Sequence, residues 1–162
     1  MSNLDAPVFG RGIEGEENAE GFYRRMQLKL KDCGVELPQD ATFLEVGSGS
    51  GAVLSFLKGK GLNIQGIDIE PQNAEIMKAD AAALPYEDAS FDCIMSKHVF
   101  DNIEHPTQSP EVEKTMLREI ARVLKSGGIY YAVEMLFEKP PEDLLRLPDR
   151  SGDYSIAVYQ KQ

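Results

Sequence analysis

The chain has 162 residues, 42% of them hydrophobic and 27% charged, which suits one domain with a single core. Its formal net charge of −10 argues against direct binding to nucleic acid or to an anionic membrane, because both would repel it. No apolar run approaches the ~20 residues that cross a bilayer, and neither Cys33 nor Cys93 has metal-ligand spacing. Residues 1–5 lack the basic and apolar regions that are typical of a signal peptide. We therefore expect a cytoplasmic protein without a metal.

Segments of strand and helix character alternate along most of the chain. In order, the pattern predicts a helix over 16–33, a strand over 41–46, a short helix over 52–58, strands over 63–69 and 91–96, a helix over 110–124, a strand over 129–136, a short helical stretch over 142–147 and a strand over 154–159. The helix after Ser109 is the clearest, because Ser109 suits the N-cap and Pro110 the first turn. Residues 1–14 have no sustained period, so we expect a loose arm before one domain over 15–162.

Residues 74–79 leave two interpretations open. Only four residues separate them from the preceding strand, whereas a crossover helix with its loops needs about ten or more. They form either a third parallel strand reached by a bare loop, which we favour, or a stunted helix. With that strand, the alternation predicts an α/β fold, a Rossmann-like three-layer sandwich whose mostly parallel sheet has six strands. The connection to 154–159 is short, so we expect this last strand to lie antiparallel beside the fifth.

A glycine-rich loop follows the first strand and opens the next helix. Gly47, Gly49 and Gly51 allow a sharp turn and a close approach of a ligand to the backbone. Asp68 ends the second strand about 20 positions after Gly47, the usual gap to a carboxylate that binds ribose hydroxyls. These features predict a nucleotide-type site. The loop with Ala52 also satisfies the dinucleotide pattern G-x-G-x-x-A, so a nicotinamide-dependent oxidoreductase remains an alternative at this point.

Four segments together resemble the class I S-adenosylmethionine-dependent methyltransferases, in the methyltransferase type 11 branch that contains the ubiquinone and menaquinone methyltransferases. They are residues 45–51 with the acid before the glycines, 66–71 at the end of the second strand, 79–92 before the fourth strand and 117–128 before the fifth. The resemblance covers about residues 40–136. It implies S-adenosyl-L-methionine as the cofactor and a methyltransferase as the function.

The resemblance also implies a set of cofactor-binding residues: Glu45, Gly47, Ser48, Gly49, Gly51, Asp68, Ile69, Asp80, Ala81 and Ser96. In this set Glu45 lies near the methionine amino group and Asp68 holds the ribose. Asp80 accepts from the adenine amino group, the Ala81 amide faces a ring nitrogen, and Ser96 contacts the methionine moiety through its backbone. Three carboxylates in an acidic chain suit a sulfonium cation better than a pyrophosphate, which favours the methyl donor over a dinucleotide.

The loop after the fourth strand is where the resemblance places the methyl acceptor. His98 is our candidate for a catalytic base, and His105 reads as a solvated loop residue. Asp101 and Asn102 stand where many relatives carry an acid–His or His–His pair, which weakens the transfer of any base from the family. The acceptor is expected to be a small molecule or a protein. The alternative within the family is a catalytically silent, cofactor-binding subunit that supports a protein partner. For either function, a protein partner or a homodimer is left open.

Overall fold

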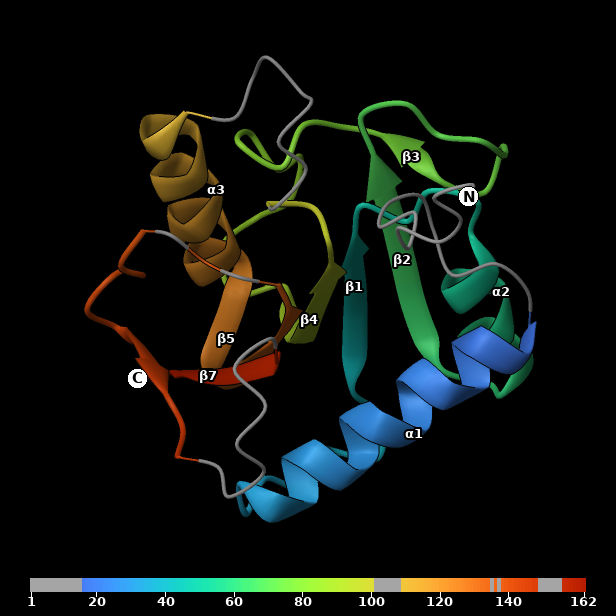
Figure 1. Ribbon diagram of the computed structural model, residues 1–162, viewed down its shortest axis with the longest axis horizontal. Coiled ribbons are helices and arrows are strands. Elements are labelled where there is room, and N and C mark those ends of the chain that lie inside the picture. Colours follow the sequence, from blue (N-terminus) through green and yellow to red (C-terminus); the bar gives the residue numbers. More distant parts are fainter. Residues whose placement is uncertain (1–15, 101–108, 135, 137, 149–155) are drawn as a thin grey trace, which may run out of the picture.

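The computed structural model describes residues 16–100, 109–134, 136, 138–148 and 156–162, and the expected arm over 1–14 lies outside them (Figure 1). Within the described part the elements are α1 (Glu16–Asp32), β1 (Thr42–Val46), α2 (Ala52–Gly59), β2 (Asn63–Asp68), β3 (Met77–Lys78), β4 (Phe91–Lys97), α3 (Pro110–Val123), β5 (Leu124–Val133), β6 (Leu144–Arg146) and β7 (Ile156–Lys161). The predicted cap of α3 is confirmed, because the Ser109 hydroxyl accepts from the Val112 amide and Pro110 occupies the first turn.

The strands form one sheet in the order β3-β2-β1-β4-β5-β7-β6. The first five of these positions are parallel, while β7 runs antiparallel to both of its neighbours, β5 and β6. The predicted α/β class, the mostly parallel sheet and the antiparallel strand beside β5 are thus confirmed. Residues 74–79 contain the short strand β3, reached from β2 through turns without a helix, as favoured from the sequence.

The prediction of a helical stretch over 142–147 is wrong, and the sheet consequently has seven strands instead of six. Leu144 packs into the core on one face of the sheet and Leu147 packs against the core on the other. Extended backbone places residues three apart on opposite faces, whereas a helix would bring them to the same face. Pairing of β6 with β7 satisfies the backbone at this edge.

Two apolar cores flank the sheet and make the three layers. On one face α1 and α2 cover the sheet, and the Phe22 ring of α1 meets the Tyr131 ring of β5 edge-on with centroids 5.6 Å apart. On the other face Leu117 and Ile120 of α3 pack with Tyr130 and the inward residues of β1 and β4. Figure 1 shows α1 and α2 near the β1 and β2 half and α3 beside β4 and β5. Because β1, β2, β3, β4 and β5 run parallel, their carboxyl ends lie at one common edge of the sheet, and the glycine loop that follows β1 lies at this edge.

A substitution at Gly66 of β2 tests how tightly the glycine loop packs on the sheet. A Cβ at this position would overlap the Ser48 hydroxyl and lie 3.1 Å from Leu54 Cδ2. We expect Gly66→Ala to lower the free energy of unfolding by about 1–3 kcal/mol, as overpacking of a filled core does. Urea unfolding measures this change.

Gly21 of α1 is the matched control, because a Cβ there meets nothing within 4 Å. Gly21→Ala is expected to raise the free energy of unfolding by about 0.5–1 kcal/mol, since alanine is the better helix former. Equal effects of the two substitutions would contradict the close packing of Ser48 against β2.

Candidate functional site

The glycine loop turns sharply at the carboxyl end of β1. Gly47, Gly49 and Gly51 have φ values of 75°, 53° and 81°, a left-handed conformation that other residues rarely adopt. The amides of Gly47 and Ser48 both donate to the Ile67 carbonyl at 2.9 Å, which ties the loop to β2. A Cβ at Gly47 would overlap the Val99 side chain, so the space that a side chain would take at this position is filled by Val99.

Asp68 lies beside this loop as the last residue of β2. Its Oδ2 accepts from the Gly49 amide and its Oδ1 from the Glu70 amide, both at 2.8 Å. Each carboxylate oxygen keeps a lone pair for a further donor. The next residue, Ile69, is 45% exposed and offers an apolar surface directly beside the carboxylate.

Asp80 and Ala81 follow β3 on the same edge of the sheet. The Asp80 side chain is exposed, and its Oδ1 accepts from the Ala82 amide at 2.8 Å. The Ala81 side chain is buried in the core under α3. A carboxylate fixed by a backbone amide thus follows each of two neighbouring strands, half-buried at Asp68 of β2 and exposed at Asp80 after β3.

Glu45 lies beneath the glycine loop and is only 8% exposed. Its carboxyl group accepts from the Ser48 hydroxyl at 3.0 Å and from the Leu54 backbone. Burial raises the pKa of this carboxyl group from 4.5 to about 8, and the charge of Asp68 raises it further, while the two hydrogen bonds oppose the shift. Glu45 and Ser48 therefore support the loop from inside, and both side chains are buried.

Ser96 at the end of β4 belongs to a buried hydrogen-bond network. Its hydroxyl donates to Glu134 Oε2 at 2.9 Å, and its oxygen lies 2.7 Å from the Tyr130 hydroxyl oxygen. Glu134 follows β5, is 2% exposed, and also accepts from Tyr130 and from the amides of Val99 and Phe100. Burial raises the pKa of the Tyr130 hydroxyl well above its usual range, and the neighbouring Glu134 adds to the shift.

Sequence reasoning missed Glu134. The available signal was an acid placed directly after the apolar run 129–133, which is buried in β5 and where an unpaired charge would be costly. The Glu134 carboxylate accepts from the Val99 and Phe100 amides and so fixes the start of the loop where the methyl acceptor is expected to bind.

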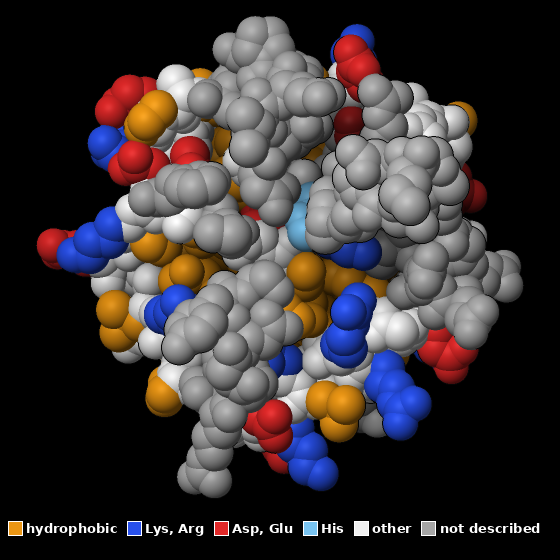
Figure 2. Space-filling model, viewed as in Figure 1, with side chains coloured by type: hydrophobic (Ala, Val, Ile, Leu, Met, Phe, Trp, Pro, Cys, Tyr) orange, Lys and Arg blue, Asp and Glu red, His pale blue; other side chains and the backbone are white. Residues whose placement is uncertain are grey.

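His98 opens that loop and has a left-handed backbone, with φ of 53°. Its amide donates to the Val133 carbonyl at 3.1 Å, and its side chain is half-buried. Figure 2 shows the pale-blue histidine side chain next to hydrophobic and basic side chains on this face. Asp101, Asn102 and His105 lie outside the described residues.

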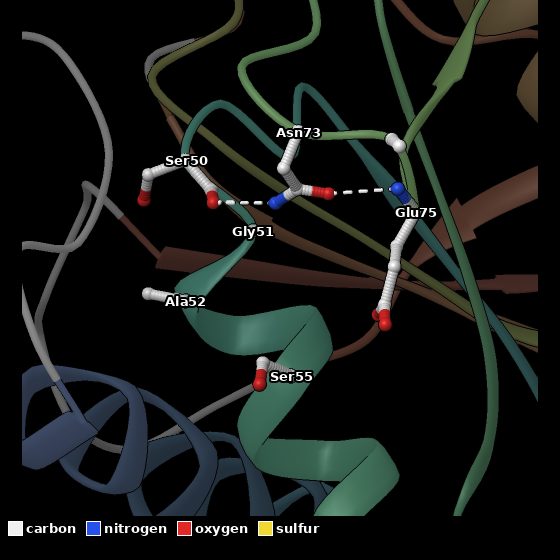
Figure 3. A pocket seen from close by; sticks show the side chains of 7 residues that line it. Ser50, Gly51, Ala52, Ser55, Asn73 and Glu75 are labelled. Atoms are coloured by element: carbon white, nitrogen blue, oxygen red, sulfur yellow. Dashed lines mark hydrogen bonds between the residues drawn. The ribbon is translucent and has the colours of Figure 1, made fainter.

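Asn73 joins the glycine loop to the connection between β2 and β3 (Figure 3). Its Nδ2 donates to the Ser50 carbonyl at 2.8 Å, and its Oδ1 accepts from the Glu75 amide at 2.9 Å. A cavity of about 430 Å³ adjoins this bridge. It is lined by Ser50, Gly51, Ala52, Ser55, Asn73, Ala74 and Glu75.

The structure thus brings most of the predicted residues to one edge of the sheet. Around the loop it gathers Glu45, Gly47, Ser48, Gly49, Gly51 and Asp68, with Ile69, Asp80 and Ala81 at the adjoining strand ends. The side chain of Ser96 points into the protein interior, so only its backbone remains for a ligand. The described residues contain no group of acids, histidines and cysteines arranged to hold a metal, and no helix among them is long and apolar enough to cross a bilayer.

Comparison with known proteins gives a consistent family. Residues 44–132, more than half of the chain, match the model of the methyltransferase domain. A sterol 4-C-methyltransferase from Caenorhabditis elegans is 28% identical over 72% of this chain and 39% of its own length. A ubiquinone/menaquinone biosynthesis C-methyltransferase from Pseudomonas savastanoi is 36% identical over 45% of this chain and 25% of its own.

A solved structure supports the same family. A SAM-dependent methyltransferase from Methanosarcina mazei is 27% identical, superimposes with a TM-score of 0.53, and is aligned over 61% of this chain and 54% of its own. The chain spans about half or less of the length of the curated relatives that it matches.

The raised pKa of Glu45 predicts a pH-dependent stability. Because the folded state holds a proton that the unfolded state releases above pH 4.5, this group lowers the free energy of unfolding as the pH rises from 4.5 to about 8. The expected slope from this group is about −1.4 kcal/mol per pH unit. Glu45→Gln should remove this slope, so the free energy of unfolding of the variant increases relative to that of the native protein as the pH rises.

Urea unfolding at several pH values across this window measures the difference between the two proteins. Glu36→Gln, a change of an exposed glutamate, is the control and should run parallel to the native protein. If Glu45→Gln also runs parallel, Glu45 is ionised in the folded state and the assignment is wrong.

Glu134 gives a second prediction, because four donors among the described residues share its carboxylate. Glu134→Ala is expected to lower the free energy of unfolding by about 3–5 kcal/mol, since it leaves buried donors without an acceptor. Glu134→Gln should cost clearly less, as the amide oxygen still accepts. The exposed Glu142→Ala is the control; comparable losses for Glu134→Ala and Glu142→Ala would contradict the network.

Proposed function

The chain belongs to the methyltransferase domain family, and from this premise we propose that it transfers the methyl group of S-adenosyl-L-methionine to an acceptor. The observation that carries the proposal is Asp68, whose carboxylate is held by the Gly49 and Glu70 amides at the end of β2. A carboxylate fixed in this way can accept from the two vicinal hydroxyls of a ribose without rearrangement. The exposed side chain of Ile69 beside it suits one face of an adenine.

The remaining predicted residues complete the proposed cofactor site. Asp80 would accept from the adenine amino group, with the Ala81 amide facing a ring nitrogen. Gly47, Gly49 and Gly51 shape the loop, and the backbone of Ser96 lies at the methionine end. We propose that Glu45 and Ser48 act mainly through the loop they support, because both side chains are buried.

When bound, the cofactor supplies a methyl group on a sulfonium sulfur, so an acceptor can attack in line without a covalent enzyme intermediate. The chain's own contribution is to position the acceptor, exclude water and, where the acceptor carries a proton, remove it. We propose His98 as that base, since its backbone is pinned to Val133 at the carboxyl end of β4. A dinucleotide is disfavoured, because its pyrophosphate would meet the Asp68 carboxylate beside the loop.

Membership of the family does not identify the methyl acceptor. The relatives' names give a sterol in one case and quinone biosynthesis in another. We propose a small-molecule or protein acceptor. We also propose a cytoplasmic location and one domain over 15–162, without direct contact to nucleic acid or membrane. The acidic balance supports this, as does the buried Cys93 thiol, which forms no disulfide.

Calorimetric titration with S-adenosylmethionine, S-adenosylhomocysteine and NAD tests the proposal. We expect the first two to bind and NAD to bind far more weakly. Asp68→Ala should weaken S-adenosylmethionine binding by about 1–3 kcal/mol, through lost hydrogen bonds to the ribose. Asp40→Ala, at an exposed carboxylate before β1, is the matched control and should bind as the native protein does.

Binding of NAD alone would overturn the proposal. Unchanged affinity in Asp68→Ala would remove Asp68 from the site. Cofactor binding without turnover on a panel of acceptors would identify the silent, partner-supporting subunit instead of the enzyme.

A further inference from the structure

The turn that carries Asp80 is attached to the rest of the protein at its two ends. At its start the Ala79 amide donates to the Asp68 carbonyl of β2 at 3.0 Å. Within the turn, the Asp80 side chain accepts from the Ala82 amide at 2.8 Å and the Asp80 carbonyl accepts from the Ala83 amide at 3.0 Å. These two hydrogen bonds are local, so the position of the Asp80 carboxylate in the molecule depends on how the two ends of the turn are held.

The far end of this turn is held by an ion pair of α3, formed by Glu119 and Arg122. Glu119 Oε2 accepts from the Leu84 amide at 2.8 Å, and Arg122 Nη2 donates to the Leu84 carbonyl at 3.0 Å. The pair itself has two short contacts, Nε to Oε1 at 2.7 Å and Nη2 to Oε2 at 2.8 Å. Both polar backbone groups of Leu84 are thus bound by one bidentate pair, and its side chain is buried in the core under α3.

Arg122 also holds the chain beyond Leu84, where the loop runs beside α3 (Figure 1). Its Nη1 donates to the Tyr86 carbonyl and to Asp88 Oδ1, both at 2.8 Å. The side chains of Arg122 and Glu119 are only 31% and 20% exposed. The hydrogen bonds from Arg122 lower the pKa of Glu119 below its usual range, so this acid stays ionised and the pair stays closed at neutral pH.

This attachment bears on the proposed adenine site. The proposed function assigns the adenine amino group to the Asp80 carboxylate and a ring nitrogen to the Ala81 amide. Recognition of a base edge needs these groups within about 0.5 Å of the productive geometry. The Asp80 side chain is exposed, so core packing does not fix it. The pair on α3, which fixes the end of the turn, is the described contact that can set its position from outside the site.

We propose that Arg122, together with Glu119, is a positioning residue for recognition of the adenine, acting through Leu84 on the turn that carries Asp80. The inference rests on the proposed function and deepens it. Selectivity for the base then depends on a side chain of α3 that does not itself touch the cofactor.

The test measures selectivity for the base, which a merely structural role would leave unchanged. S-adenosylhomocysteine and its analogue without the 6-amino group are titrated calorimetrically into the native protein and into Arg122→Met. The native protein should prefer S-adenosylhomocysteine by about tenfold or more, the size of one hydrogen bond to a charged group. Asp80→Ala, which removes that bond directly, should bring the ratio of the two affinities close to one. Arg122→Met should do the same, by weakening S-adenosylhomocysteine and sparing the analogue.

Two variants serve as controls. Lys125→Met removes an ion pair of 2.9 Å with Asp92 at the opposite edge of the sheet, and should leave the ratio unchanged whatever its effect on stability. Arg118→Met changes an exposed cation of the same helix and should also keep the native ratio. Arg122→Lys is the second test variant. Lysine keeps the charge, but its single nitrogen cannot reproduce the planar fork, so the ratio should fall by less than in Arg122→Met.

Urea unfolding checks that each variant is folded, and Arg122→Lys decides if Arg122→Met is not. The inference is overturned if the folded Arg122 variants keep the native ratio, including the case in which both affinities fall equally. It is also overturned if the native protein binds the two ligands equally, because Asp80 then does not recognise the amino group. Absence of S-adenosylhomocysteine binding in the native protein would instead refute the proposed function.

Discussion

The site depends on backbone segments that approach one another too closely for a side chain to intervene. Cβ atoms at Gly47, Gly51 and Gly66 would overlap Val99, Asn73 and Ser48, respectively. These contacts come from different parts of the chain: the loop after β4, the connection between β2 and β3, and the glycine loop itself. The loop therefore takes its shape from its neighbours as well as from its own sequence, and a shift in any of them would move it.

Two buried carboxyl groups hold the segments that meet there. Glu45 accepts from Ser48 below the glycine loop, and Glu134 accepts from the amide of Val99 above it. Since Val99 in turn covers Gly47, the two acids act on opposite sides of one contact. A change in the loop after β4 would thus reach the glycine loop through packing alone, a link between the proposed acceptor and cofactor regions that needs no ligand to exist.

Local patterns in the sequence were sufficient for the central part of the fold. The strand–loop–helix unit around Gly47, the spacing to Asp68 and the cap at Ser109 all depend on residues close together in the chain, and the structure has them as expected. The strand at Leu144–Arg146 was missed because its pairing with β7 and the opposite burial of Leu144 and Leu147 are tertiary effects. Glu134 was missed for the same reason, since its carboxylate accepts from the amides of Val99 and Phe100, which lie much earlier in the chain.

Acidic and basic side chains lie at different places along the edge of the sheet where the parallel strands end. Carboxylates of Asp68 and Asp80 stand at the ends of β2 and β3, while Lys97 stands at the end of β4. A ligand with a polar hydroxyl-rich end and an oxyanion at the other end would be oriented by this field before close contacts form.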